Sequence, residues 1–291
     1  MSNFLDRFDR PDSTLTIGNG WTNGAASANL AAFIASYPTY MKAAGIVGNT
    51  AQISTGILGG NFSFYRLINT IGDVTDAWSM TAKIVGTSKS GNDAWRLQIG
   101  QNGEYGTVGG YILAGLGPGL IGLYRDGGVQ LSSFAASNED GTIITLRVAP
   151  VYSGSTFSYN IIECYVNGSK LASVQDVNIQ FTQDIYATVY IAASPNNIIG
   201  FDDIMVGDAT LTLKSNGAEG LTDRTLSAGY CYVLPETDGG WNTRPDGSGA
   251  SYSGMIDLTS GLPDNATSVP DVVLCAPGKL RADPLLAFAG V

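Results

Sequence analysis

The stretch Ile199-Gly-Phe-Asp-Asp-Ile-Met-Val-Gly-Asp208 decides the fold of this 291-residue chain. It closes a long run of short segments in which apolar and polar residues alternate between turn residues. Such alternation is typical of β-strands with one buried and one solvated face. The opening segment Phe4-Leu-Asp-Arg-Phe-Asp-Arg-Pro-Asp12 alternates in the same way as far as Pro11. The sequence therefore predicts a short strand at each end of one large β domain.

Between these ends, further segments place an apolar residue at every second position. They lie at 78–84, 95–99, 144–148 and 185–191. Asp126-Gly127 and Asn167-Gly168 separate neighbouring segments, and such pairs readily supply the positive φ angles of a tight hairpin turn. Many short strands joined by tight turns predict an antiparallel sandwich or barrel.

One segment has a helical period instead. Apolar residues fall at i, i+3, i+4 and i+7, at positions Leu30, Phe33, Ile34 and Tyr37. Ser27 or Asn29 can cap the start of a helix, and Pro38 interrupts the pattern. We expect a short helix, confined mainly to about residues 28–44, as an insertion between the first strands.

The order of the strand motifs is distinctive. The chain runs through a Trp-containing strand (78–85), Trp95-Arg-Leu97, a Gly-Tyr strand (110–114), Leu123-Tyr-Arg-Asp-Gly127, Glu163-Cys-Tyr-Val-Asn-Gly168 and Phe201-Asp-Asp-Ile204. This order resembles the concanavalin A-like (laminin G-like) family of lectin and glucanase sandwiches, a fold also found in bacteriophage virion-surface proteins. The resemblance covers residues 4–208. It implies an all-β, two-sheet antiparallel jelly-roll sandwich whose first and last strands lie side by side. The fold hosts many functions and does not by itself select one.

Residues 209–291 differ in composition, because 216–268 are rich in Gly, Asp, Ser, Thr and Pro. Strand candidates occur at 229–234, 253–258 and 272–275. We therefore predict two domains, a sandwich at 1–208 and a small β-rich assembly or attachment domain at 209–291. The second has few apolar residues for its length, so we expect a neighbour to supply part of its core.

The end of the chain is unusually apolar. Its apolar residues are Leu280, Leu285, Leu286, Phe288 and Val291. Burying one Leu or Phe side chain stabilises a protein by roughly 1.5–3 kcal/mol. We therefore expect the tail to be buried, and we assign Leu285, Leu286, Phe288 and Val291 to assembly.

Charge and composition exclude several classes of function. The formal net charge is −10, and no Lys/Arg cluster is present to neutralise phosphates, so no nucleic-acid partner is expected. The absence of histidine removes Ser-His-Asp and Cys-His catalysis and His-ligated zinc. No apolar run is long enough to span a bilayer, and the N-terminus does not resemble a signal peptide. Neither membrane insertion nor a cofactor is expected.

Carboxylates do not form a glycosidase pattern. Glycosidases of the resembled family carry Glu-x-Asp-x-x-Glu on one strand, which places acid and nucleophile roughly 5 Å apart. No such triplet occurs here, and we interpret Glu104, Glu139 and Glu163 as solvated charges. The acidic residues of the two end strands leave a calcium site open as an alternative to plain surface charge. These residues are Asp6, Asp9, Asp202 and Asp203. No metal site is predicted.

The tryptophans differ in their surroundings. Trp78 and Trp95 lie on inward rows and are assigned to the core, and Trp21 is expected over the sandwich end. Trp241 lies among turn residues, so it is the candidate ligand platform, with an anchor to a neighbouring subunit as the alternative. Cys164 alternates with apolar residues and is assigned to the core, while pairing of Cys231 with Cys275 stays open.

These features predict a non-enzymatic bacteriophage structural protein, as a head decoration, tail or fibre component. We expect it on the virion surface, in contact with other virion proteins and copies of itself, with host surface glycans as possible ligands. The alternatives are a carbohydrate-active enzyme (a glycoside hydrolase or lyase) with a degenerate motif, or a soluble sugar-binding module.

Overall fold

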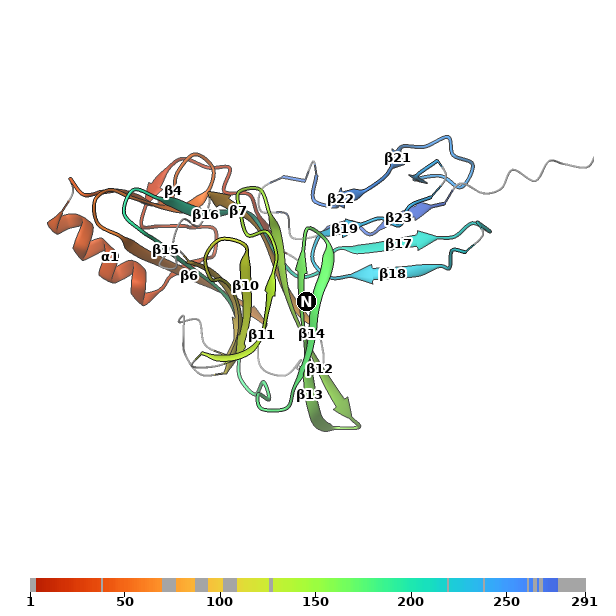
Figure 1. Ribbon diagram of the computed structural model, residues 1–291, viewed down its shortest axis with the longest axis horizontal. Helices are drawn as coiled ribbons and strands as arrows, with labels where there is room; N and C mark the ends of the chain where they lie inside the picture. The colour runs from red at the N-terminus through yellow and green to blue at the C-terminus, as the bar shows by residue number, and fades with distance from the viewer. Residues whose placement is uncertain are drawn as a thin grey trace, which may run out of the picture.

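The structure is a computed structural model. It describes residues 4–37, 39–69, 77–86, 94–101, 109–125, 128–218, 220–237, 239–260, 262–263, 266 and 269–276, without the side chains of 25–28, 41–42 and 69. Figure 1 shows a β-sandwich on one side and a smaller β unit on the other. Within the described residues, no helix is both long and apolar enough to cross a membrane.

The first sheet of the sandwich, sheet A, contains both ends of the predicted domain. Its strands run in the order β14 (Ser169–Asp176), β13 (Thr156–Val166), β12 (Ile143–Ser153), β7 (Trp78–Gly86), β16 (Ile198–Val206), β5 (Ala51–Thr55), β4 (Met41–Ile46) and β2 (Ser13–Thr14). The first strand, β1 (Phe4–Asp6), pairs with β16 outside this order. Phe4 lies opposite Val206. The predicted pairing of the first and last strands is confirmed.

The second sheet, sheet B, packs against sheet A. Its strands run in the order β11 (Val129–Ala135), β10 (Leu120–Arg125), β9 (Gly110–Gly115), β8 (Ala94–Gly100), β15 (Ile185–Ala193), β6 (Gly60–Asn69) and β3 (Thr22–Asn23). The core fills the space between the sheets, where Trp95 of β8 meets Phe201 of β16 edge to face at 6.1 Å. Trp78 packs on Phe181 at 5.1 Å. The predicted all-β antiparallel sandwich is confirmed, and both tryptophans are in its core.

The helix α1 (Ala25–Ser36) begins before the predicted start at about residue 28 and ends before the predicted end at about residue 44. Tyr37 closes it by donating its backbone N–H to the carbonyl oxygen of Phe33. The prediction was wrong for residues 41–44, which belong to β4 and pair with β5. These residues lie beyond Pro38, where the helical pattern is interrupted, and they form a hairpin with β5 instead. The helix lies along β6 at the end of the molecule remote from the smaller unit (Figure 1).

The C-terminal unit contains a mixed sheet and a two-stranded sheet. The strands of the mixed sheet run in the order β18 (Arg224–Ser227), β17 (Thr210–Lys214), β23 (Val272–Cys275), β20 (Trp241–Asn242) and β21 (Ser251–Tyr252). The two-stranded sheet consists of β19 (Cys231–Val233) and β22 (Met255–Asp257). The parallel pairing of β17 with β23 closes a long loop. Strands occur at each of the three predicted segments.

The apolar core of the C-terminal unit continues into the sandwich. Leu5, Ile143 and Met205 of sheet A are buried in the same cluster as Leu211, Trp241 and Leu274. The expected neighbour that supplies part of this core is therefore the chain's own sandwich.

Candidate functional site

The outer face of sheet B carries the most distinctive group of side chains. Along β15, Ile185, Ala187, Val189 and Ile191 point into the core. Tyr186, Thr188 and Tyr190 therefore point outward, because successive side chains of a strand lie on opposite faces. The same alternation places Tyr65, Arg96, Gln98 and Tyr124 on this outer face.

Strand register brings these outward residues together. Thr188 lies opposite Tyr65 on one side and Gln98 on the other. The same row continues through Ile112 to Tyr124. The neighbouring row places Tyr190 beside Arg96. We call the set Tyr65, Tyr124, Tyr186, Tyr190, Arg96 and Gln98 the tyrosine face. Between the rings lie the side chains of Thr188 and Gln98, each 1% exposed.

The rings of the tyrosine face are held by specific contacts. Tyr65 and Tyr186 meet edge to face at 5.9 Å. Tyr124 lies over Gly122, where a Cβ atom would come within 2.6 Å of its ring carbon Cε2. The guanidinium carbon of Arg96 lies 5.2 Å from the centre of the Tyr190 ring. All four tyrosines are partly exposed, so their rings are both fixed and accessible.

Arg96 is partly desolvated. Burial lowers the pKa of its guanidinium, although the nearby Tyr190 and Tyr124 oppose this effect. The group stays a cation, since the pKa of an arginine lies far above physiological pH. A partly buried cation interacts more strongly with an anion than one in bulk water, because the local dielectric constant is lower.

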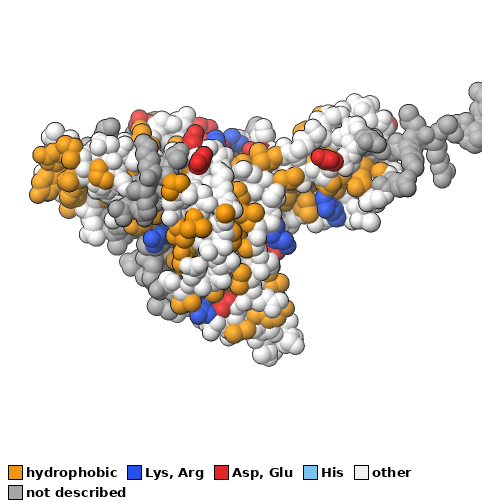
Figure 2. All heavy atoms as spheres, viewed as in Figure 1, with side chains coloured by type: hydrophobic (Ala, Val, Ile, Leu, Met, Phe, Trp, Pro, Cys, Tyr) orange, Lys and Arg blue, Asp and Glu red, His pale blue; other side chains and the backbone are white. Residues whose placement is uncertain are grey.

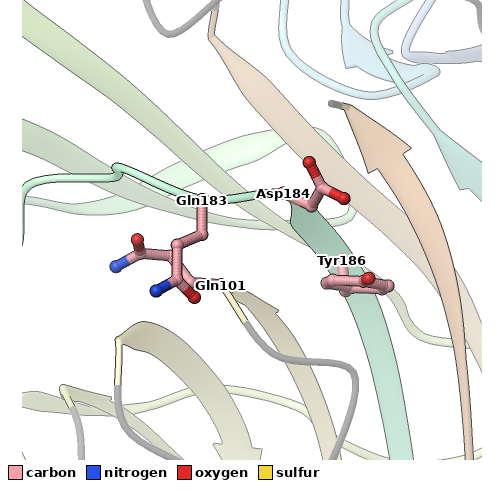
Figure 3. Close-up of a pocket in the computed structure, with 4 residues that line it drawn as sticks. All are labelled: Gln101, Gln183, Asp184 and Tyr186. Atoms are coloured by element: carbon pink, nitrogen blue, oxygen red, sulfur yellow. The ribbon is translucent and has the colours of Figure 1, made fainter. Parts of the chain in front are cut away.

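A pocket of about 290 Å³ opens at one end of the tyrosine face, lined by Gln101, Gln183, Asp184 and Tyr186. Figure 3 shows that the last three come from the start of β15 and the segment before it, with Gln101 facing them from the end of β8. The Gln101 Oε1 atom accepts hydrogen bonds from the backbone N–H and the hydroxyl of Thr182, at 2.8 and 3.1 Å. The pocket thus combines amides, one carboxylate and an aromatic ring.

This arrangement contains groups that can recognise a ligand. Aromatic rings can stack on the apolar faces of a ligand while amides and hydroxyls form hydrogen bonds with its polar groups. Glycoside hydrolysis uses a pair of carboxylates. The described lining of the pocket contributes one carboxylate, from Asp184.

The ligand-platform prediction for Trp241 is corrected by the structure. Its side chain is 1% exposed and lies in the core shared with the sandwich. The indole N–H donates to the carbonyl oxygen of Pro235 at 2.7 Å. A ring enclosed on both faces can stack neither on a ligand nor on another subunit.

The acidic end-strand residues have protein partners. The Asp6 carboxylate accepts from the backbone N–H of Phe8, from Arg10 and from the Trp21 indole, at 2.9, 2.6 and 2.9 Å. Trp21 is thereby fixed at the sandwich end, as expected. Within the described part of the chain, no group of three or more His, Cys, Asp or Glu residues is placed to hold a metal ion.

Two of the three other acidic residues of the end strands are in ion pairs as well. Asp202 lies 3.2 Å from the Lys83 ammonium, and Asp203 lies 3.5 Å from Arg7. Asp9 is exposed. These contacts favour plain charge pairing over the calcium alternative.

Of the three glutamates interpreted as solvated charges, the structure describes Glu139 and Glu163. Glu163 is paired with Arg147 and Lys170, both at 3.0 Å. Burial raises the pKa of Glu163, but hydrogen bonds from Lys170 and Tyr165 and the charge of Arg147 outweigh it and hold the pKa below its usual value. Glu139 is exposed in a turn, and Glu104 lies outside the described residues.

The cysteines are free, and all three are buried. Cys231 lies opposite Asp257 and Cys275 opposite Asn242, in different sheets. The open pairing of Cys231 with Cys275 is therefore not formed. The tail residues Leu280, Leu285, Leu286, Phe288 and Val291 lie outside the described residues, so their assignment to assembly stays a prediction.

The tyrosine face was missed in the sequence, although a signal was present. The alternation at 95–99 and 185–191 identified the inward residues. The residues between them, Arg96, Gln98, Tyr186 and Tyr190, follow from the same period. What the alternation could not supply was the register that brings Tyr65 and Tyr124 into the same row.

No protein-family model and no curated protein matches the sequence. Several solved structures are similar to part of the chain. The carbohydrate recognition domain of Emp47p is 12% identical with a TM-score of 0.42, over 70% of this chain and 93% of that one. The alginate lyase Aly36B is 9% identical with a TM-score of 0.42, over 70% and 96%. The carbohydrate-binding module CBM66 from Bacillus subtilis is 10% identical with a TM-score of 0.37, over 66% and 98%. These similarities carry no argument about function.

Proposed function

We propose that this protein is a non-enzymatic glycan-binding protein whose tyrosine face holds an extended oligosaccharide. The single observation that carries the proposal is the set of four partly exposed tyrosines on one sheet face, with a pocket of polar groups at one end. Aromatic rings beside hydrogen-bonding groups suit a sugar, which has apolar ring faces and polar edges.

The dimensions of the face favour a chain of sugars over a single one. Asp184 and Tyr190 are six residues apart, which corresponds to about 20 Å along a β-strand. The pocket lies at one end of this length and Arg96, beside Tyr190, at the other. A ligand that contacts both ends must be extended.

The proposal is tested by binding of the purified protein to an array of bacterial and host polysaccharides. Tyr186→Ala removes the ring shared by the pocket and the tyrosine face and should abolish or strongly weaken binding to whichever glycan is retained. Tyr252→Ala is the matched control, since Tyr252 is exposed on the C-terminal unit. Equal binding by wild type and Tyr186→Ala would contradict the proposal.

We extend the proposal to display on a bacteriophage virion, with the C-terminal unit as the attachment element. The support is the low content of charged residues, 14%, visible as sparse charge on the face in Figure 2. The C-terminal unit also lies at one side of the sandwich (Figure 1). Antibody labelling of phage particles in electron micrographs tests this. Labelling at regular surface positions is expected, and protein found solely in the particle-free fraction would contradict it.

The proposal excludes a catalytic step. Incubating the protein with each retained glycan should release no shorter oligosaccharide and no unsaturated product. Release of either, abolished by Asp184→Asn, would instead favour a carbohydrate-active enzyme.

A further inference from the structure

The end of the sandwich that carries α1 has an exposed apolar surface. Tyr37, Tyr40, Ile57 and Leu58 are each more than a third exposed, and Ile57 is the most exposed of them, at 65%. Figure 2 shows hydrophobic side chains gathered at this end, where α1 lies in Figure 1. We call these four residues, together with the partly buried Phe33, the apolar end.

The residues of the apolar end belong to one continuous surface. The ring of Phe33 lies 5.2 Å from that of Tyr37, which lies 6.2 Å from that of Tyr40. The backbone of Tyr40 lies against Gly56, because a Cβ atom added to Gly56 would overlap the Tyr40 carbonyl oxygen. Ile57 follows directly in the chain. The end of the helix and the turn after β5 are therefore neighbours.

The sequence that forms this end carries almost no charge. Residues 22–65 include one charged residue, Lys42, whose side chain lies outside the described ones. In the whole chain, 14% of the residues are charged. A helix at a protein surface normally has charged residues on its outer face, but α1 has none. Depletion of charge around exposed aromatic residues is typical of the centre of a protein–protein interface.

A second apolar feature is the segment 284–291, Pro-Leu-Leu-Ala-Phe-Ala-Gly-Val. It contains no charged residue, and an apolar segment of this kind adheres to other apolar surfaces in water. The described chain leads toward it from Ala276, whose backbone N–H donates to the carbonyl oxygen of Lys214 at 2.8 Å in the C-terminal unit. That unit and α1 lie at opposite ends of the molecule (Figure 1).

We propose that the apolar end of one copy binds residues 284–291 of another copy, so that copies of this protein associate head to tail. One such contact removes both apolar features from water, and burial of apolar surface is the main driving force of association. A contact between two apolar ends would cover the first feature and leave the second uncovered. The inference goes beyond the proposed glycan binding and does not rest on it.

The position of the segment favours a contact between copies over one within a chain. Residues 284–291 follow the C-terminal unit, so a neighbouring copy can present them without the chain folding back along the sandwich. The contact joins two different surfaces and is therefore heterologous, which allows a closed ring or a longer row of copies.

The charge of the chain is compatible with association at these places. Two copies with a net charge of −10 each repel one another. Neither residues 22–65 nor residues 284–291 contain Asp or Glu. The proposed contact therefore brings together the parts of the sequence that add nothing to this repulsion.

The test mixes two variants with complementary defects. A chain shortened to end at Asp283 lacks the segment but keeps the apolar end. Ile57→Asp keeps the segment but places a charge on the apolar end. Size-exclusion chromatography with multi-angle light scattering measures the mass of each. Wild type should increase in mass with concentration, each variant alone should be monomeric, and the mixture should form a one-to-one complex.

A second measurement follows the contact directly. A labelled peptide of residues 280–291 is titrated with the shortened chain, and its fluorescence anisotropy is measured. Ile57→Asp in the shortened chain should weaken binding about 10- to 100-fold. Val177→Asp is the matched control, because Val177 is 67% exposed and lies after β14, and it should change nothing. A peptide with Phe288→Asp should bind as weakly as Ile57→Asp does. Thermal melting verifies that each variant is folded.

Each outcome decides for or against the inference. A one-to-one complex in the mixture, with peptide binding that Ile57→Asp weakens, supports it. A shortened chain that still self-associates would indicate contact between two apolar ends and overturns it. Wild type that stays monomeric at every concentration also overturns it. Glycan binding is measured separately on the array, so failure of this inference and failure of the proposed function are distinguishable.

Discussion

The backbone N–H of Gly229 donates a hydrogen bond to the Asp208 carboxylate at 2.8 Å. Asp208 follows the last strand of the sandwich, and Gly229 lies in the C-terminal unit just before β19. The same carboxylate accepts from the Ser79 hydroxyl, and the Arg147 guanidinium lies 3.5 Å away. Asp208 therefore connects the two parts of the molecule.

Gly229 is predicted to be intolerant of a side chain. Its φ is +74°, and a Cβ atom there would overlap the hydroxyl oxygen of Thr81. Gly217 has nearly the same φ, +75°, with nothing within 4 Å of the added atom. Gly217→Ala should lower the free energy of unfolding by about 1–2 kcal/mol, because alanine is strained at this positive φ. Gly229→Ala should carry the same loss and a further loss of roughly 1–3 kcal/mol, because the added methyl group overlaps its neighbours. Urea unfolding measures both, and equal losses would contradict the close packing of the two units.

Glu163 is predicted to contribute to stability in a pH-dependent way. Its pKa in the folded protein lies below the ordinary value of 4.5. Its contribution is therefore present above that value and is lost as the pH falls through the folded pKa. Glu163→Gln should lower the free energy of unfolding at pH 7, and its curve should converge with that of wild type in acid.

The control for this measurement is Glu139→Gln, because Glu139 is exposed. Its curve should follow that of wild type throughout. A Glu163→Gln curve parallel to wild type from pH 7 down to pH 2 would show that the contacts with Arg147 and Lys170 do not matter.

The thiols are predicted to be unreactive in the native protein. Burial raises the pKa of Cys164 and of Cys231 to about 12, so little thiolate exists at neutral pH. A thiol reagent such as 5,5′-dithiobis(2-nitrobenzoic acid) should react with no cysteine before unfolding and with three afterwards. One reactive thiol after unfolding without a reductant would indicate a disulfide and contradict the structure.

Trp241 is predicted to be structural. Trp241→Ala removes a fully buried ring from the core of the C-terminal unit and should cost about 3–5 kcal/mol. Calorimetry measures the loss. Glycan binding by the folded fraction should be unchanged, since the tyrosine face belongs to the sandwich, and loss of binding by folded Trp241→Ala protein would contradict the placement of the site on that face.

The sandwich could be predicted from the sequence because its signals are local. Alternation identified the inward tryptophans, and it needs just the period-two rule and short turns. The pairing of the strands that contain Phe4 and Val206 was implied by the resemblance to the concanavalin A-like family, because a local pattern does not show which distant strands are neighbours.

The features that could not be predicted depend on distant partners. Trp241 has turn residues beside it in the sequence, but it is buried in an apolar cluster that includes Leu5 and Met205 of the sandwich. The predicted helix extended to residue 44, but residues 41–44 lie beyond Pro38, where the helical pattern is interrupted, and they pair with β5 as a strand. The tyrosine face needs the register of five strands, which no local pattern contains.

The central claim is that the outer face of sheet B binds an extended glycan. The most direct measurement is a crystal structure of the protein with an oligosaccharide of the glycan retained on the array. The account predicts sugar density along β15, from the pocket at Gln101 and Tyr186 to Arg96 and Tyr190. Sugar bound instead at the C-terminal unit, or at the exposed apolar side chains Tyr37 and Ile57 beyond the helix, would contradict it.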